Sequence, residues 1–309
     1  MSRNVGIALG SGAARGLSHI GVLKALEEEG VRPSVIVGTS MGAFVGGVYA
    51  AGRLDELTEL VLGLDWKKAA GYFVEMNFPQ SGIIEGNKIS ELLNSLVGDT
   101  VLLDLPVRFA AVATDIENGE EVVLDEGALT DTIRASISVP GIFTPARVGD
   151  RLLVDGGLVN PVPVSVCRTL GADRVIAVDL NQGRIQDIRG SSFPEDDEAP
   201  GFLKKEKPWR PFSWFEEKAG QTDARWLDRV KSWVSRDQTS SLGIFDVLGN
   251  SLRIMEEQIA ASRLEIDRPD LLIHPRIGHV RFLEFHLAPK IIEAGYRATK
   301  RAWRAFSAK

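Results

Sequence analysis

Short apolar runs alternate with amphipathic stretches along this chain up to Asn181. Near-continuous apolar runs are typical of strands buried on both faces of a sheet, whereas apolar residues spaced three and four apart predict helices. The expected strands are Val5–Leu9, Ser34–Gly38, Arg108–Thr114, Arg151–Val154 and Arg174–Asp179. The expected helices are Ala14–Glu29, Met41–Ala51, Lys88–Leu96, Leu129–Ser136 and Val164–Leu170. This alternation predicts an α/β fold of three layers, in which helices cover both faces of a mostly parallel central sheet.

The composition changes after this core, which we place at residues 1–182. Residues 183–240 mix charges, Pro and Gly, as expected of a mobile acidic segment, and carry four of the six tryptophans. A helical pattern at Ser213–Ser235 suits a lid over a site, a helix lying on a membrane, or a plain surface helix. Residues 241–309 carry two further helical patterns, Asp246–Ser262 and Leu287–Phe306, and a strand, Leu271–His274, which we expect to complete the same domain.

Composition narrows the class of protein. The chain has 309 residues, 44% of them apolar, so it is long enough to bury a substantial core. A net charge of −6 argues against nonspecific binding of nucleic acid. The single cysteine, Cys167, excludes an internal disulfide, and with four histidines it argues against a zinc site. Because no apolar run reaches the length of a signal peptide or a membrane span, we expect a soluble, cytoplasmic protein without metal or other cofactor.

The first candidate for chemistry is Ser40, in the sequence Gly38-Thr39-Ser40-Met41-Gly42. A G-x-S-x-G pattern between a strand and a helix is typical of a nucleophile elbow, in which flanking glycines relieve crowding at a sharp turn. The alternative is a serine that caps the following helix.

The glycine-rich stretch Leu9–Gly16, LGSGAARG, follows the first expected strand and opens a helix. Its backbone amides suit either a developing oxyanion or the phosphates of a nucleotide. The match to a dinucleotide fingerprint is poor, because Arg15 stands at the last glycine position and Gly16 comes one residue late. An oxyanion-binding loop beside Ser40 is therefore the better interpretation.

A serine nucleophile needs a base. Histidine is the usual choice, but His19 lies in a helix as a packing or capping residue, and nothing around His274, His279 or His286 indicates a catalytic loop. Asp155 is the stronger candidate, because it ends an expected strand and precedes two glycines, where open α/β sheets place their sites. The alternative is a hairpin turn at Asp155-Gly156, although the sequence that follows does not alternate like a returning strand.

Four motifs occur in order: Leu9–Gly16 with SHIGVLKAL, Gly38–Gly42, SISVPGIFTP at Ser136–Pro145, and Asp155-Gly156-Gly157 with NPVP. Together they resemble the patatin-like phospholipases, above all the short bacterial members related to the catalytic domain of neuropathy target esterase. The resemblance covers residues 4–181 and implies the patatin fold, a calcium-independent Ser–Asp dyad carried onto Ser40 and Asp155, and no histidine in catalysis.

The resemblance also implies an oxyanion hole made by the amides of Ser11, Gly12 and Ala13, although Ser11 and Ala13 replace two of the family's usual glycines. Arg15 matches the family's basic position, where it orders the loop or meets an anionic head group. The remaining motif positions are Gly10, Gly16, Gly38, Gly42, Gly156 and Gly157.

The expected function is hydrolysis of phospholipid or lysophospholipid esters through an acyl-enzyme. The alternatives are a soluble carboxylesterase or thioesterase with the same dyad, and a lipid-binding regulatory protein without turnover. Peripheral contact with the inner membrane surface is expected of a lipid hydrolase, and the basic stretch Lys290–Lys309 suits anionic lipid or a solvated helix face.

Overall fold

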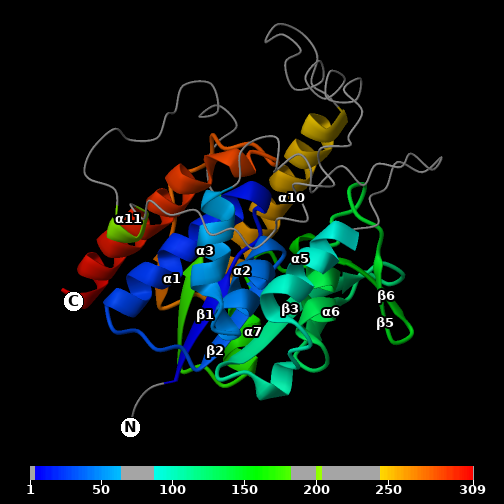
Figure 1. Ribbon diagram of the computed structural model, residues 1–309, viewed down its shortest axis with the longest axis horizontal. Helices are drawn as coiled ribbons and strands as arrows, with labels where there is room; N and C mark the ends of the chain where they lie inside the picture. The colour runs from blue at the N-terminus through cyan, green and yellow to red at the C-terminus, as the bar shows by residue number, and fades with distance from the viewer. Residues whose placement is uncertain (1–3, 64–86, 182–199, 204–243, 309) are drawn as a thin grey trace, which may run out of the picture.

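Eight strands form one mixed sheet in the computed structural model, which describes residues 4–63, 87–181, 200–203 and 244–308 (Figure 1). The strand order is β5-β6-β3-β2-β1-β7-β8, and β4 pairs with β3 off this path. The strands are β1 (Val5–Leu9), β2 (Val35–Thr39), β3 (Arg108–Asp115), β4 (Glu121–Leu124), β5 (Ala146–Val148), β6 (Arg151–Asp155), β7 (Arg174–Val178) and β8 (Leu271–Ile273).

The centre of the sheet is parallel and buried on both faces. Strands β3, β2, β1, β7 and β8 run parallel to one another, whereas β6 and β4 pair antiparallel with β3, and β5 pairs antiparallel with β6. Along β1, Ile7 and Leu9 join the apolar cluster on one face and Ala8 joins the cluster on the other. The prediction of a three-layer α/β fold with a mostly parallel sheet is confirmed.

Helices cover both faces of the sheet (Figure 1). The Ile7 face packs against α1 (Ser18–Glu28), α2 (Met41–Ala50), α3 (Leu54–Leu62), α5 (Asn87–Val97), α6 (Leu129–Ser136) and α11 (Ala288–Ser307). The Ala8 face packs against α7 (Val164–Thr169) and α10 (Ile244–Asp267). Short 3-10 turns lie at Ala13–Leu17, Leu102–Asp104, Gly156–Leu158, Gly201–Leu203 and Phe285–Leu287. Within the described ranges, no helix is long and apolar enough to cross a membrane.

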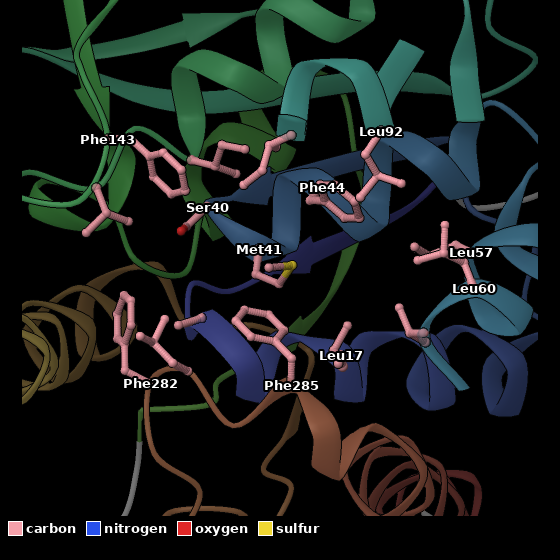
Figure 2. A pocket seen from close by; sticks show the side chains of 16 residues that line it. Leu17, Ser40, Met41, Phe44, Leu57, Leu60, Leu92, Phe143, Phe282 and Phe285 are labelled. Carbon is pink, nitrogen blue, oxygen red and sulfur yellow. The ribbon is translucent and has the colours of Figure 1, made fainter. Parts of the chain in front are cut away.

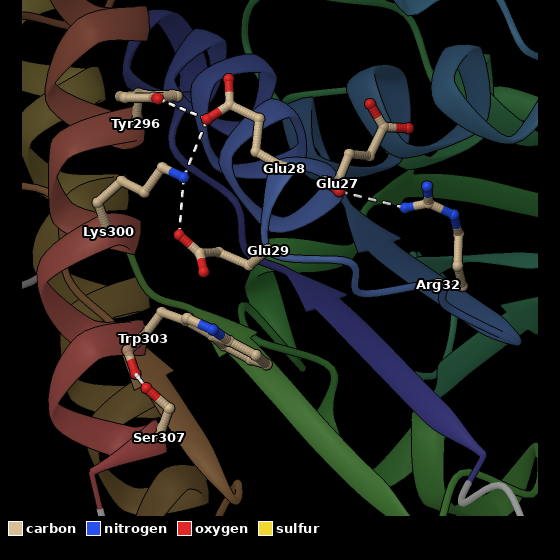
Figure 3. A network of polar contacts seen from close by, with 8 residues as sticks. All are labelled: Glu27, Glu28, Glu29, Arg32, Tyr296, Lys300, Trp303 and Ser307. Atoms are coloured by element: carbon tan, nitrogen blue, oxygen red, sulfur yellow. Dashed lines mark hydrogen bonds and ion pairs between the residues drawn. The ribbon is translucent and has the colours of Figure 1, made fainter.

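Helices α1 and α11 lie side by side because glycines let their backbones meet. A Cβ atom on Gly21 would lie 1.9 Å from the Ile292 carbonyl oxygen, and one on Gly295 would lie 2.1 Å from that of Ser18. At the end of this contact the Lys300 ammonium bridges two carboxylates at the end of α1, 2.9 Å from Glu28, the last residue of the helix, and 2.7 Å from Glu29, which follows it (Figure 3). This packing fixes α1, the helix that follows the glycine-rich loop.

The basic side chains of α11 are partly used within the protein. Lys300 binds Glu28 and Glu29, and Arg297 contacts Glu293 one helical turn away at 2.6 Å. These pairs favour the interpretation of Lys290–Lys309 as a solvated helix face over that of a lipid-binding patch.

The strands expected from the sequence agree with the structure to within one residue at each end, and Leu271–Ile273 joins the same sheet through β7. Strands β4 and β5 and helix α3 were not predicted. The two strands are only four and three residues long, too short to show a period of two. The helical pattern at Ser213–Ser235 lies outside the described residues.

Candidate active site

Ser40 occupies a strained corner between β2 and α2. Its backbone has φ 57° and ψ −123°, a conformation that non-glycine residues seldom adopt. Its N–H donates to Ser136 Oγ at 2.9 Å, and the Ser136 hydroxyl donates to the Val112 carbonyl at 2.6 Å. The Ser40 side chain makes no capping hydrogen bond to α2. The helix-cap interpretation is therefore wrong, and the strain is of the kind found at functional sites.

Close packing explains the glycines on both sides of this corner. A Cβ atom on Gly42 would lie 2.1 Å from the Leu9 carbonyl oxygen, and one on Gly38 would lie 2.3 Å from the Ala43 nitrogen. The other motif positions share this property, with an added Cβ atom at 2.7 Å or less from a neighbouring atom: Gly10, Gly16, Gly156 and Gly157. These glycines let the loops that surround Ser40 approach one another.

Asp155 ends β6 directly opposite Ser40. The Ser40 hydroxyl donates to Asp155 Oδ2 at 2.5 Å, and the Gly157 N–H donates to Asp155 Oδ1 at 2.7 Å. The main chain of Asp155 is also held, because its N–H donates to the Ser138 carbonyl and its carbonyl accepts from the Thr114 hydroxyl. A 3-10 turn follows Asp155, so the hairpin interpretation is wrong.

The environment makes Asp155 a stronger base than an exposed carboxylate. Burial raises its pKa to about 6, although the hydrogen bonds from Ser40 and Gly157 lower it in part. At neutral pH the carboxyl group is therefore ionised and able to accept a proton. Ser40 and Asp155 are 6% and 3% exposed, so this proton transfer would take place away from bulk water.

The glycine-rich loop supplies two uncommitted amides, not three. The Ser11 N–H donates to the Pro161 carbonyl at 2.8 Å, which corrects the expectation that Ser11 contributes an oxyanion donor. For the N–H groups of Gly12 and Ala13, no acceptor is found among the described residues. Ala13 lies beside Ser40 in the cavity lining and has φ 48°, so the loop keeps its positive-φ backbone without a glycine there.

Arg15 stabilises this loop from inside the protein. It is 2% exposed, and its guanidinium donates to the Leu180 carbonyl at 3.0 Å and to Asn181 Oδ1 at 3.3 Å. The Asn181 amide donates in turn to Ser11 Oγ at 3.1 Å. Burial lowers the pKa of Arg15 to about 10, which still leaves it charged at neutral pH. Of the two expectations for Arg15, ordering the loop agrees with this position, and contact with a lipid head group does not.

The four histidines lie away from the dyad. His19 is buried, with Nε2 at 2.8 Å from the Gly10 carbonyl, and burial lowers its pKa to about 4, so the neutral ring donates to this oxygen. His274 lies beside Asp179, and His286 is exposed. None of the four lines either cavity at Ser40.

Two cavities meet at Ser40 (Figure 2). The larger has a volume of about 110 Å³, and among the described residues that line it Ser40 is the only one with a polar side chain. Figure 2 shows Phe143 and Phe282 near Ser40, and Leu57 and Leu60 at the far end. The smaller has a volume of about 10 Å³ and is lined by Asp155 and Glu256 as well as Ser40.

Sequence reasoning missed Glu256. It belongs to α10, in register with the buried residues Leu252 and Ala260, one turn away on either side. An acidic residue on the buried face of an amphipathic helix is the signal that was available.

The motifs that build this site also define its family. The family model for patatin-like phospholipases matches residues 7–168, which include the glycine-rich loop, Ser40 and Asp155. The chain belongs to the patatin-like phospholipase family. This patatin-like protein is thus a member of a family of lipid ester hydrolases, as its motifs predicted.

Relatives of this patatin-like protein carry the name NTE. An uncharacterized NTE family protein of Mycobacterium tuberculosis is 33% identical over 99% of this chain and 92% of its own length. Lysophospholipase nte1 of Emericella nidulans is 32% identical over 68% of this chain, which corresponds to 14% of that longer protein. Among solved structures, VipD of Legionella pneumophila matches with a TM-score of 0.47 and 13% identity over 98% of this chain and 67% of VipD.

Proposed function

We propose that this protein is a serine acyl hydrolase that cleaves carboxylic esters of phospholipids or lysophospholipids through Ser40 and Asp155. The observation that carries the proposal is the hydrogen bond of 2.5 Å from the Ser40 hydroxyl to Asp155, beside an apolar cavity that Ser40 lines. The lysophospholipase name of the Emericella relative supports the same substrate class.

The larger cavity suits an acyl chain. Its lining includes residues of α2, α3, α5 and the Phe282–Phe285 segment, and the described residues in it are apolar except for Ser40. A fatty acyl chain placed here loses contact with water along its length, which contributes about 0.8 kcal/mol per buried methylene group. The ester carbonyl would then lie at Ser40, where the cavity ends.

Acylation follows from the geometry. The Ser40 oxygen attacks the ester carbonyl carbon while its proton moves to Asp155 Oδ2, and the carbonyl oxygen becomes an oxyanion. The N–H groups of Gly12 and Ala13 stabilise this oxyanion, each such donor contributing about 2.7–4 kcal/mol in comparable enzymes. Collapse of the intermediate breaks the bond to the alcohol, which takes the proton from Asp155 and leaves the acyl group on Ser40.

We expect no metal ion to take part in these steps. The proton acceptor is Asp155 and the oxyanion donors are main-chain amides, so we expect full turnover in excess chelator. A calcium requirement, seen as activity lost with chelator and restored by calcium, would contradict this part of the proposal.

The direct test is labelling with a fluorophosphonate probe, followed by peptide mapping and a lipid panel. We expect the probe on Ser40, no labelling of Ser40→Ala, and greater turnover of long-chain phospholipid or lysophospholipid than of short water-soluble esters or thioesters. A folded protein without label at Ser40 would support the lipid-binding alternative instead. Preference for short esters would support the carboxylesterase alternative.

Peripheral contact with a membrane remains part of the proposal, because the substrate resides there. The tryptophan-rich segment at residues 205–236 is the candidate, since tryptophan favours the membrane interface. Co-sedimentation with liposomes should weaken when residues 205–236 are deleted. Equal binding and equal lipid turnover in the deletion variant would contradict it.

A further inference from the structure

Glu256 brings a second carboxyl group to the site from a helix outside the family match, which ends at residue 168. A Cβ atom on Gly157 would lie 2.4 Å from Glu256 Oε1 and 3.1 Å from Asp155 Oδ1, so the two carboxyl groups flank the same glycine. Glu256 also accepts a hydrogen bond from the Ser11 side chain. It therefore contacts both loops that surround the dyad.

Burial, together with a nearby negative charge, keeps Glu256 neutral near pH 7. Burial and the negative charge of Asp155 raise its pKa to about 8, against the opposing effects of Arg15 and the Ser11 hydrogen bond. Asp179 adds a further negative charge, and Arg253 lies one turn away on the same helix. Between about pH 6 and pH 8, Asp155 is thus ionised while Glu256 carries a proton.

The smaller cavity has the size of one water molecule. Its volume of about 10 Å³ is close to the minimum that a single water requires, and a buried water needs two to four polar partners. Ser40, Asp155 and Glu256 supply polar groups, and the rest of the lining is apolar, with Leu158, Leu252 and Phe282 among its members. Ser40, which carries the acyl group in the proposed mechanism, is part of this lining.

We propose that Glu256 is a positioning residue for deacylation, which holds the hydrolytic water between its carboxyl group, Asp155 and the acylated Ser40. This inference rests on the proposed acyl-enzyme and extends it to the second half of the reaction. Acylation does not require this water, so Glu256 acts on one half of the cycle.

Deacylation begins with attack by this water on the acyl group. The water oxygen bonds to the acyl carbonyl carbon, one water proton passes to the Asp155 carboxylate, and the other stays hydrogen-bonded to Glu256. Collapse breaks the bond from the carbonyl carbon to Ser40 Oγ, which recovers its proton from Asp155. The products are the fatty acid and the free enzyme. Ionised Glu256 would place a second negative charge beside the developing oxyanion, which disfavours the reaction.

The test separates the two halves with a chromogenic long-chain ester, whose burst reports acylation and whose steady rate reports deacylation. Glu256→Ala is expected to keep the burst. It should slow the steady rate by about tenfold to a hundredfold, because a reactant that is held less accurately reacts more slowly. Methanol competes with water for the acyl-enzyme. With methanol added, the Glu256→Ala variant should therefore form more methyl ester relative to free acid than the wild type does. Glu257→Ala is the matched control, because Glu257 is the next residue on α10 but does not line the cavity.

A second variant tests the charge. Glu256→Gln keeps hydrogen-bonding atoms but cannot ionise, so we expect near-normal deacylation at pH 7. The wild-type rate should rise near pH 6 with Asp155 and fall near pH 8 with Glu256, and only the fall should vanish in Glu256→Gln. This readout stands even if Glu256→Ala fails to fold.

The outcomes distinguish the inference from the function on which it rests. Equal losses of burst and steady rate with an unchanged ratio of methyl ester to acid would overturn the role of Glu256, as would an alkaline limb that persists in Glu256→Gln. A wild-type enzyme that shows neither a burst nor label at Ser40 would overturn the proposed acyl-enzyme itself.

Discussion

The two cavities that meet at Ser40 differ in size, lining and origin. The larger is apolar and is built by helices on the Ile7 face of the sheet, whereas the smaller presents two carboxyl groups, one of them from α10 on the Ala8 face. Ser40 thus lines both the larger, apolar cavity and the smaller cavity, which is polar and has the size of one water molecule. In the proposed function, the first cavity would select the substrate and the second would hold the groups that transfer protons.

The largest effect is expected where the two cavities meet. Ser40→Ala removes the nucleophile, and Asp155→Asn removes the base, so each should lower turnover of a long-chain ester by at least about a thousandfold. His286→Ala is the control and should keep its activity, because His286 is exposed and lines neither cavity. Loss of activity in a histidine variant alone would move the base elsewhere.

Burial of Asp155 beside the smaller cavity should also lower the free energy of unfolding at neutral pH. Because the pKa of Asp155 is about 6 in the folded protein and 3.8 for an unperturbed aspartate, the folded state binds the proton more tightly than the unfolded state. The free energy of unfolding therefore falls as pH rises from about 4 to about 6. Asp155→Asn has no carboxyl group to ionise, so at pH 7 it should be more stable than the wild type by up to about 3 kcal/mol. Urea unfolding at pH 4 and pH 7 measures the difference. An Asp155→Asn variant less stable than the wild type at pH 7 would contradict it.

A substitution in the larger cavity should change the selectivity for acyl-chain length. Leu60 lies at the end of the cavity away from Ser40 (Figure 2), and Leu60→Trp would shorten the space for a chain. We expect kcat/KM for a long acyl chain to fall about tenfold relative to a short one, within the range for a changed hydrophobic pocket. Leu103→Trp, at a residue 80% exposed and outside the lining, is the control. Equal losses on both chain lengths would argue against an acyl pocket.

The smallest effect is expected in the glycine-rich loop, where Ala13 lines both cavities. Ala13 has φ 48°, which glycine adopts without the strain that alanine carries. Ala13→Gly should therefore raise the free energy of unfolding by about 1 kcal/mol. Ala25→Gly, in the middle of α1, should lower it. Thermal unfolding of both variants checks the sign, and a destabilised Ala13→Gly would show that the loop is not strained.

The sequence was informative where function depends on local geometry. Ser40 directly follows strand β2 and Asp155 ends strand β6, and each has glycines within two residues, so both features can be recognised without a structure. The buried strands of the parallel centre were equally clear, because each is a short apolar run.

The remaining features depend on contacts between distant parts of the chain. The Ser11 amide is lost as an oxyanion donor only because Pro161 lies within hydrogen-bonding distance. Glu256 reaches the site only because α10 packs against the loop at Gly157, and a single acidic residue in a helix does not indicate what it faces. Such pairings cannot be inferred from spacing along one strand or helix.

Trapping the covalent intermediate tests the central claim most directly. A long-chain ester should be mixed with the enzyme, quenched within the first turnover and mapped by peptide mass spectrometry. The account predicts the acyl mass on the peptide containing Ser40 in the wild type, and no acyl adduct within the same time in Asp155→Asn. An acyl group on another residue, or equally rapid acylation of Ser40 without Asp155, would contradict it.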